Sequence, residues 1–195
     1  PKSRHAVLRF RFNAVKSSVV MDTFPTVLEI AFPGVKVNLS KTDWYAEFDN
    51  GSQIWFGGLD DKERTEKILG MEFVTIYLNE ASQIPWGSRN VALTRLAQKV
   101  DQDLEGREPM PLKPRMYYDC NPPPKNHWTY RAFHDKTDPE SKLPLPNPES
   151  YSWFQINPSS NAENLGDGYL ATLASMSARL RKRFEAGEFG GGGGG

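Results

Sequence analysis

The stretch Phe73–Pro85, FVTIYLNEASQIP, begins with a run of β-favouring residues and changes to polar residues at Asn79-Glu80. Such a run without polar alternation is typical of a strand buried on both faces, as in parallel sheets covered by helices. Because open α/β sheets bind ligands at the carboxyl ends of their strands, we expect Glu80 at a ligand-binding edge. Nucleotide-hydrolysing enzymes place there the groups that hold magnesium and position water. Glu80 is therefore a candidate catalytic base; the alternative is an ordinary charged residue at a strand end.

The composition favours an intracellular protein with one main core. The chain has 195 residues, with 24 basic and 24 acidic side chains, so any contact with nucleic acid must depend on a local cluster of charges. The single cysteine, Cys120, excludes an internal disulfide framework and fits a reducing compartment. No apolar run approaches the roughly 20 residues of a membrane-spanning helix, so we expect no membrane contact.

Both ends of the chain predict a segment of a longer protein. Pro1 stands shortly before a predicted strand, so we expect the domain to be entered partway through. Gly190–Gly195 are expected to be flexible linker or added sequence without fold information.

Strands and helices alternate along the chain, which predicts an α/β fold with a mainly parallel sheet. The dipeptide Asn50-Gly51 between two aromatic-rich runs is a strong β-hairpin signal. The expected strands are residues 6–12, 35–38, 44–48, 52–56, 73–78, 115–119 and 151–156. The expected helices are residues 13–30, interrupted or bent near Pro25, then 62–69, 86–104, 128–133 and a helical pair within 161–187.

A second strand ends in polar residues of the same kind. Arg115–Tyr118 leads into Asp119-Cys120-Asn121, and three prolines then prevent further regular hydrogen bonding. If the two strands are neighbours, Glu80 and Asn121 lie on one edge, where a carboxylate can polarise water and an amide can bind a phosphate oxygen. The alternative is that Asn121 only caps the turn before the prolines.

These motifs together resemble the ATPase domain of the large terminase subunit of tailed bacteriophages. The resemblance rests on five stretches in the family's order from Ala6 to Gly190: RFRFNAVKSSV, NGSQIWFGGLDDKERTEKILG, a strand ending in NEAS, DCNPPPKNHWTYRAF, and NAENLGDGYLATLASMSARLRKRFEAGEFG. It implies a P-loop NTPase-like fold of the ASCE type, with a small C-terminal helical subdomain. It also implies ATP and Mg²⁺ as cofactors.

The resemblance assigns roles by position. Glu80 takes the place of the base for the attacking water, and Asn79 that of a magnesium-site acid. Asn121, with Asp119, takes the place of the motif that senses the γ-phosphate and couples hydrolysis to movement. Arg64 or Lys67 stands near where some members supply a finger in trans, and the chemistry favours Arg64 because guanidinium binds phosphoryl oxygens in a fork. The alternative for both is a solvated helix face.

Two departures from the family pattern stand out. Asn79 is a neutral amide, a weaker magnesium partner than a carboxylate, so metal binding is expected to rest on water and other groups. The chain has no Gly-Lys dipeptide and hence no phosphate-binding loop, which in the family precedes the Ala6 strand. The nuclease domain of the family would follow Gly190.

Basic residues near the end of the chain are candidates for contact with DNA phosphates, against the alternative of a solvated helix face. They are Arg179, Arg181, Lys182 and Arg183. Near the end of the first strand, Arg9 either faces the nucleotide or pairs with a carboxylate. Trp128 and Tyr130 are interpreted as packing residues, with base stacking as the alternative.

The sequence therefore predicts part of an ATPase that drives double-stranded DNA into a procapsid. Residues 1–160 would be the partial ATPase core, 161–189 a helical lid or linker subdomain, and 190–195 the glycine tail. The expected partners are double-stranded DNA, the portal protein, the small terminase subunit and identical copies in a ring, in the host cytoplasm at the portal vertex. The alternatives are an inactive remnant that serves as a binding or oligomerisation module, and another nucleic-acid-dependent ATPase such as a helicase.

Overall fold

The computed structural model describes residues 2–176, 178–184 and 187–189. The chain forms two compact units, Pro1–Asp119 and Cys120–Gly195, and each is described by itself. The glycine tail 190–195 lies outside the described residues. The predicted boundary after residue 160 stays a prediction.

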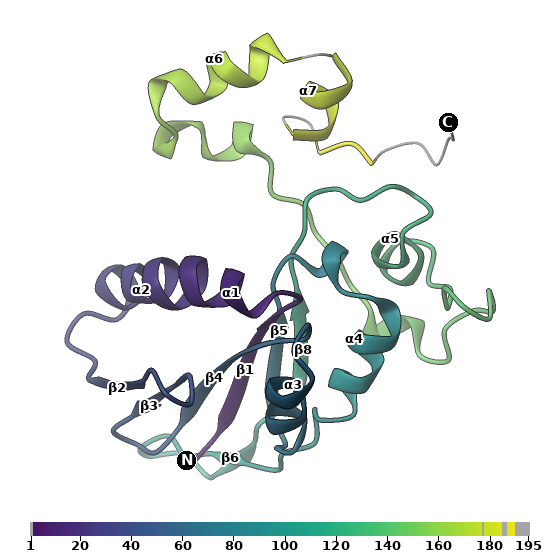
Figure 1. Ribbon diagram of the computed structural model, residues 1–195. Helices are drawn as coiled ribbons and strands as arrows, with labels where there is room; N and C mark the ends of the chain where they lie inside the picture. Colours follow the sequence, from purple (N-terminus) through teal and green to yellow (C-terminus); the bar gives the residue numbers. More distant parts are fainter. Residues whose placement is uncertain (1, 177, 185–186, 190–195) are drawn as a thin grey trace. The chain divides into compact units, whose positions relative to one another are not determined.

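A six-stranded, mainly parallel sheet forms the first unit (Figure 1). Its inner strands β4, β1, β5 and β8 are parallel, and β2 and β3 extend it antiparallel on the β4 side. In spatial order the strands are β2 (Val37–Ser40), β3 (Tyr45–Phe48), β4 (Gln53–Gly58), β1 (Arg4–Arg9), β5 (Thr75–Leu78) and β8 (Arg115–Tyr118). The predicted sheet and the adjacency of the strands that end at Glu80 and Asp119 are confirmed.

Helices cover both faces of this sheet. The packing partners of Phe56 and Gly57, two adjacent residues of β4, lie on opposite faces. Phe56 belongs to a core cluster with Phe12 and Val15, which lie in the first helical segment, and with Trp44. Gly57 points the other way, and a Cβ built on it would lie 2.9 Å from Ile68 of helix α3 (Lys62–Leu69). Successive residues of a strand alternate between its faces, so the first helical segment and α3 pack on opposite sides.

Strand β5 lies deep in this core. Ile76 and Leu78 are fully buried, and the preceding Phe73 and Val74 are buried as well, whereas Thr75 and Tyr77 are half-buried. Both neighbours of β5 pair with it in parallel, which accounts for the continuous apolar character of the sequence. The buried strand fixes the point at which Asn79 leaves the sheet.

The local signals for the hairpin and for α3 are also confirmed. At the hairpin turn, Gly51 has a φ of 79° and the Asn50 side chain accepts a hydrogen bond from the Ser52 amide at 2.9 Å. At the start of α3, the carboxylate of Asp61 accepts the Arg64 amide at 2.8 Å, as expected of an N-cap.

The first helical segment is continuous but changes geometry. It comprises α1 (Phe12–Ala14), the π-helical η1 (Val15–Thr23) and α2 (Phe24–Ala31). Pro25 lies in the first turn of α2, so the predicted interruption takes the form of a change from π to α geometry.

The predicted helix 86–104 is wrong in its second half. Helix α4 spans Trp86–Leu93 only, after the short 3-10 turn η2 (Ala81–Gln83). Beyond it the chain returns to the sheet, because the Phe73 amide donates to the Arg95 carbonyl at 2.8 Å and the Gln98 amide donates to the Phe73 carbonyl at 3.1 Å. A small hairpin of β6 (Asp101–Gln102) and β7 (Met110–Pro111) follows. Tertiary hydrogen bonds thus override the helical periodicity.

The predicted strand 151–156 is also wrong. These residues have no regular secondary structure and belong to no strand of the described part of the chain, and Trp153, Phe154 and Ile156 are exposed. A strand requires a hydrogen-bonding partner in addition to β-favouring residues, and none is present among the described residues.

The second unit is helical and irregular. It contains α5 (Trp128–Phe133), η3 (Pro148–Ser150), η4 (Pro158–Asn164), α6 (Asp167–Ser175) and α7 (Ala178–Phe184). Trp128 and Tyr130 are buried, which confirms them as packing residues. Within the described residues, no helix is long and apolar enough to cross a bilayer.

Candidate functional site

The carboxyl ends of β1, β5 and β8 meet at one edge of the sheet. The aligned residues Leu8, Leu78 and Tyr118 are followed by Arg9, Asn79 and Asp119. The Asn79 amide donates to the Leu8 carbonyl at 2.9 Å, and the Asp119 amide donates to the Leu78 carbonyl at 3.2 Å. Three neighbouring strands therefore deliver a guanidinium, an amide and a carboxylate to this edge.

Asp119 holds the turn that follows β5. Its Oδ1 accepts the backbone N–H of Glu80 at 3.0 Å, and its backbone carbonyl accepts the N–H of Ala81 at 2.8 Å. The side-chain amide of Asn79 donates to both carboxylate oxygens, at 3.0 and 3.2 Å. The adjacent strand thus fixes the backbone from Asn79 to Ala81.

This turn places Glu80 in a left-handed backbone conformation, with φ 50° and ψ 53°. For a residue with a Cβ this conformation costs about 1–2 kcal/mol, so the surrounding hydrogen bonds must maintain it. The Glu80 side chain forms an ion pair with Arg9, with Oε2 and Nη2 2.5 Å apart. The predicted base is therefore held from two sides, by Asp119 through its backbone and by Arg9 through its carboxylate.

The Arg9 side chain is largely buried at the sheet edge, with 14% of its surface exposed, whereas the Glu80 side chain is 41% exposed. Its Nη1 donates to the Ser18 hydroxyl at 2.8 Å, and Ser18 donates in turn to the Ala14 carbonyl at 2.6 Å. The Nε of Arg9 is buried without a hydrogen-bond partner among the described residues. Of the two alternatives left open for Arg9, pairing with a carboxylate is confirmed.

Tyr77 completes the polar cluster beneath Asn79. Burial raises the pKa of the Tyr77 phenol, and the negative charge of Asp119 raises it further. The Asn79 amide lies 3.5 Å from the phenol oxygen. The phenol therefore stays protonated at neutral pH and contributes no charge to the edge.

The two candidate finger residues lie on α3 and already have contacts. The Arg64 guanidinium lies 3.9 Å from the centroid of the Phe12 ring, and Lys67 forms an ion pair with Asp43. Both side chains are exposed, so neither is locked in place by burial. A role in trans for Arg64 or Lys67 stays a prediction.

The remaining predicted residues belong to the second unit. Asn121 follows Cys120 directly. Arg179, Arg181 and Lys182 are exposed on α7, with Lys182 3.9 Å from a Glu188 carboxylate oxygen. The side chain of Arg183 lies outside the described residues. DNA contact by these residues stays a prediction.

A buried arginine that was not predicted from the sequence, Arg89, ties α4 to β8. Arg89 is 4% exposed, its Nε donates to the Tyr118 hydroxyl at 2.9 Å, and its guanidinium lies 4.6 Å from the Trp86 ring centroid. Its spacing from Trp86 and Ala92 on the buried side of the helix was the available signal. Tyr118 immediately precedes Asp119, so this contact steadies the residue that holds Glu80.

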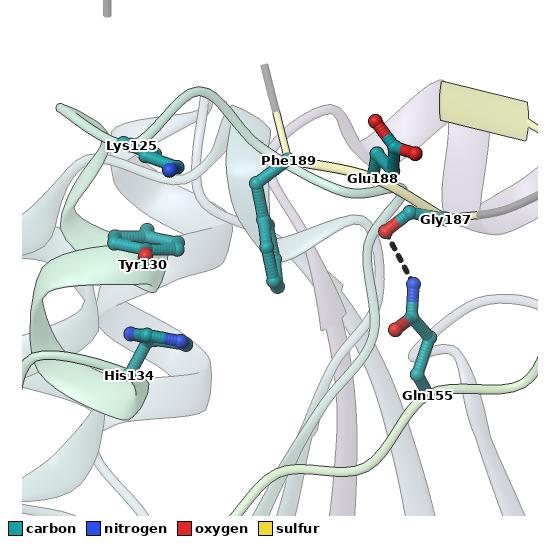
Figure 2. A pocket seen from close by; sticks show the side chains of 7 residues that line it. All are labelled: Lys125, Tyr130, His134, Gln155, Gly187, Glu188 and Phe189. Atoms are coloured by element: carbon teal, nitrogen blue, oxygen red, sulfur yellow. Dashed lines mark hydrogen bonds between the residues drawn. The ribbon is translucent and has the colours of Figure 1, made fainter. Parts of the chain in front are cut away.

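The second unit contains an open hollow lined by aromatic rings (Figure 2). Tyr130 and His134 stack with ring centroids 4.4 Å apart, and the Phe189 ring meets Tyr130 edge-on at 4.8 Å. Gln155 donates a hydrogen bond to the Gly187 carbonyl on the far side. Lys125 and Glu188 also line the hollow. Its aromatic rings pack against one another, so we interpret the hollow as a packing feature and not as a ligand site.

Comparisons with known proteins agree on one family and one fold. A model of the family described as phage terminase large subunit matches residues 1–165. Among solved structures, the large terminase of a thermophilic bacteriophage is 15% identical, with a TM-score of 0.70 over 97% of this chain and 41% of that chain. No curated protein sequence matches the chain.

Two further solved structures share this likeness. The large terminase of the same thermophilic bacteriophage, in complex with ATP-gamma-S, is 16% identical, with a TM-score of 0.64 over 97% of this chain and 40% of that chain. The large terminase ATPase domain of Thermus phage P74-26 is 14% identical, with a TM-score of 0.53 over 97% of this chain and 77% of that chain. These matches confirm the predicted P-loop NTPase-like sheet flanked by helices. The chain spans about two fifths of the thermophilic bacteriophage protein, 41% of its length.

Proposed function

The chain belongs to the phage terminase large subunit family, and from that membership we propose that it is the ATP-hydrolysing core of a DNA-packaging motor subunit. The parent protein couples ATP hydrolysis to the movement of double-stranded DNA into a procapsid. The observation that carries this proposal is the position of Glu80 at the end of β5, held by Asp119 and Arg9.

Glu80 acts as the general base in this proposal. A base must be fixed within reach of the water that attacks the γ-phosphate, and such a group typically contributes 10²–10⁴-fold to the rate. The left-handed turn aims the Glu80 carboxylate across the edge of the sheet toward Arg9. The ion pair with Arg9 fixes the direction of the carboxylate.

The substrate is ATP, a proposal supported by the thermophilic bacteriophage large terminase, whose structure was solved with ATP-gamma-S. The chain itself has no Gly-Lys dipeptide, so the phosphate-binding loop must come from elsewhere in the parent. Strand β8 ends the sheet, and no strand pairs with its outer side among the described residues. We place the strand that leads to the phosphate-binding loop at that outer side, and we expect the chain alone to have no meaningful turnover.

The residues at the edge fit a magnesium ion as the second cofactor. Mg²⁺ prefers oxygen ligands and is commonly held by one or two carboxylates together with substrate phosphates. Glu80, Asp119 and the side-chain carbonyl of Asn79 are the oxygen donors at this edge. An ion held by these residues would neutralise negative charge on the nucleotide's phosphates.

The wider setting follows from the same family assignment. The parent acts in the host cytoplasm, as a ring of identical subunits at the portal vertex of the procapsid, with the portal protein and the small terminase subunit as partners. An endonuclease domain belongs to the same parent. The exposed basic residues Arg179, Arg181 and Lys182 on α7 are the proposed DNA contacts, and Arg64 is the favoured trans finger.

Asn121→Ala in the full-length parent tests the link between hydrolysis and movement. The amide of Asn121 is proposed to sense the γ-phosphate, so its loss should leave ATP turnover near the wild-type rate but lower the DNA packaged per ATP. A hydrogen bond to a charged group is worth about 1.5–3 kcal/mol, which corresponds to roughly a 10- to 100-fold loss of coupling. The measurement is nuclease-protected DNA in procapsids, divided by phosphate released.

Asn147→Ala, at an exposed site before η3, is the matched control and should package normally. Normal packaging by Asn121→Ala would remove Asn121 from the coupling role. A wild-type parent that unwinds DNA but does not package it would contradict the proposed function itself.

A further inference from the structure

We propose that Asp119, at the end of β8, supplies the magnesium-directed carboxylate that position 79, at the end of β5, lacks. This inference rests on the proposed function, because it concerns the same nucleotide site. It changes the role of Asp119, which the family resemblance places in the coupling motif, and it makes β8 the strand that holds the metal.

The first step is the orientation of Asn79. A carboxylate can only accept hydrogen bonds, so the side chain of Asn79 must turn its NH₂ group toward Asp119. The distances agree, with Nδ2 3.0 Å and 3.2 Å from the two carboxylate oxygens. The face of Asn79 that meets Asp119 is therefore a donor face, which cannot bind a cation.

The second step is the charge balance of the edge. Glu80 is already paired with Arg9 at 2.5 Å. Asp119 is exposed, and the ion pairs formed by the described residues give it no Lys or Arg partner. Asp119 is thus the carboxylate at this edge whose charge is not balanced, and a divalent cation would balance it.

The third step is the remaining capacity of Asp119 as a ligand. An ionised carboxylate has about four lone-pair positions. The backbone N–H of Glu80 donates to Oδ1, the side-chain amide of Asn79 is shared between Oδ1 and Oδ2, and the Tyr77 phenol also forms a hydrogen bond with this carboxylate. Three donors leave room on the carboxylate for a cation, and they fix its orientation in the way that neighbouring groups orient a metal ligand.

The arrangement has a functional consequence. Asp119 contacts the base through the Glu80 backbone and lies two residues before Asn121 in the sequence. A metal held by Asp119 would directly affect the conformation of the turn at Glu80, because the metal and the Glu80 backbone N–H would both contact the Asp119 carboxylate. In a site with an acid at position 79, the metal ligand would instead lie on the same strand as the base.

The test uses the full-length parent with Mn²⁺ as the probe ion and ATP-gamma-S as the nucleotide. Mn²⁺ affinity is measured by electron paramagnetic resonance, and the gain in ATP-gamma-S affinity on adding the ion is measured by calorimetry. Asp119→Asn keeps an oxygen that can accept the Glu80 amide but removes the charge. Loss of an outer-shell partner already lowers metal affinity about 10- to 100-fold, so we expect Asp119→Asn, which removes the charge of a direct ligand, to lower Mn²⁺ affinity by at least that much.

The exchange variant Asn79→Asp/Asp119→Asn separates a metal role from a structural one. It returns the carboxylate to position 79, so we expect Mn²⁺ affinity to recover to within a few-fold of the wild type. Asp22→Asn, an exposed acid on η1, is the control and should leave Mn²⁺ affinity unchanged. Asn79→Asp alone places two carboxylates side by side, so its unfolding temperature should rise more on adding Mn²⁺ than that of the wild type.

The outcomes distinguish a failure of the Asp119 assignment from a failure of the ATPase proposal. Wild-type Mn²⁺ affinity in Asp119→Asn, or failure of the folded exchange variant to recover it, would overturn the assignment of Asp119 and leave the ATPase proposal standing. A wild-type parent that binds no ATP-gamma-S, with or without the ion, would contradict the proposed function and this inference together.

Discussion

Glu80→Gln in the full-length parent is expected to lower the rate of ATP turnover by about 10²–10⁴-fold, the usual contribution of a general base. Glutamine keeps the shape of the side chain and can still accept a hydrogen bond from Arg9, but it cannot take a proton from water. The backbone hydrogen bond to Asp119 does not involve the side chain and should persist. The variant should therefore bind ATP with nearly wild-type affinity, and the defect should lie in kcat.

The matched control is Glu29→Gln, an exposed glutamate on α2. It should leave kcat unchanged. If Glu80→Gln hydrolyses ATP at the wild-type rate, Glu80 is not the base. If it loses ATP binding instead of kcat, its role is in the nucleotide site and not in proton transfer.

Gly58→Ala is expected to destabilise the chain by about 1–3 kcal/mol or more, because the new methyl group has no space. A Cβ at this position would lie 2.4 Å from the Phe12 amide nitrogen and 2.6 Å from the Phe12 Cα. Those atoms belong to the backbone at the start of α1, which cannot rotate away as a side chain could. Gly58 also pairs with Arg9 across the sheet, so the shift would reach the partner of Glu80.

The control is Gly87→Ala, near the start of α4, where a Cβ would meet no atom within 4 Å. Alanine is the better helix former, so this change should be neutral or stabilise by at most about 1 kcal/mol. Urea unfolding of the chain, followed by circular dichroism, measures both variants. A Gly58→Ala free energy of unfolding equal to that of Gly87→Ala would disprove the close approach of β4 to α1.

Most of the fold could be predicted from local sequence patterns. The apolar run before Asn79 and the Asn50-Gly51 dipeptide each encode a strand or a turn through neighbours in sequence, and both are confirmed. The predictions failed where distant partners decide. Helix α4 ends at Leu93 because the following residues bond to the backbone of Phe73, and residues 151–156 form no strand without a partner.

The features of the candidate site likewise fall into those that local sequence predicts and those that depend on distant residues. The position of Glu80 after a buried strand, and the neighbouring strand that ends at Asp119, were both predictable from apolar runs that stop at polar residues. The left-handed conformation of Glu80 was not, because it arises from hydrogen bonds to Asp119, 39 residues away. The pairing of Arg9 with Glu80 depends on the same turn, so the sequence could not decide it either.

The most direct test of the central claim is Mg²⁺-dependent ATP turnover, measured side by side for the full-length parent and for this chain alone. We expect steady phosphate release by the parent and none above background by the chain, because the chain contains no Gly-Lys dipeptide and hence no phosphate-binding loop of its own. Brisk hydrolysis by the chain alone, or no hydrolysis by a folded parent supplied with Mg²⁺ and DNA, would contradict the account.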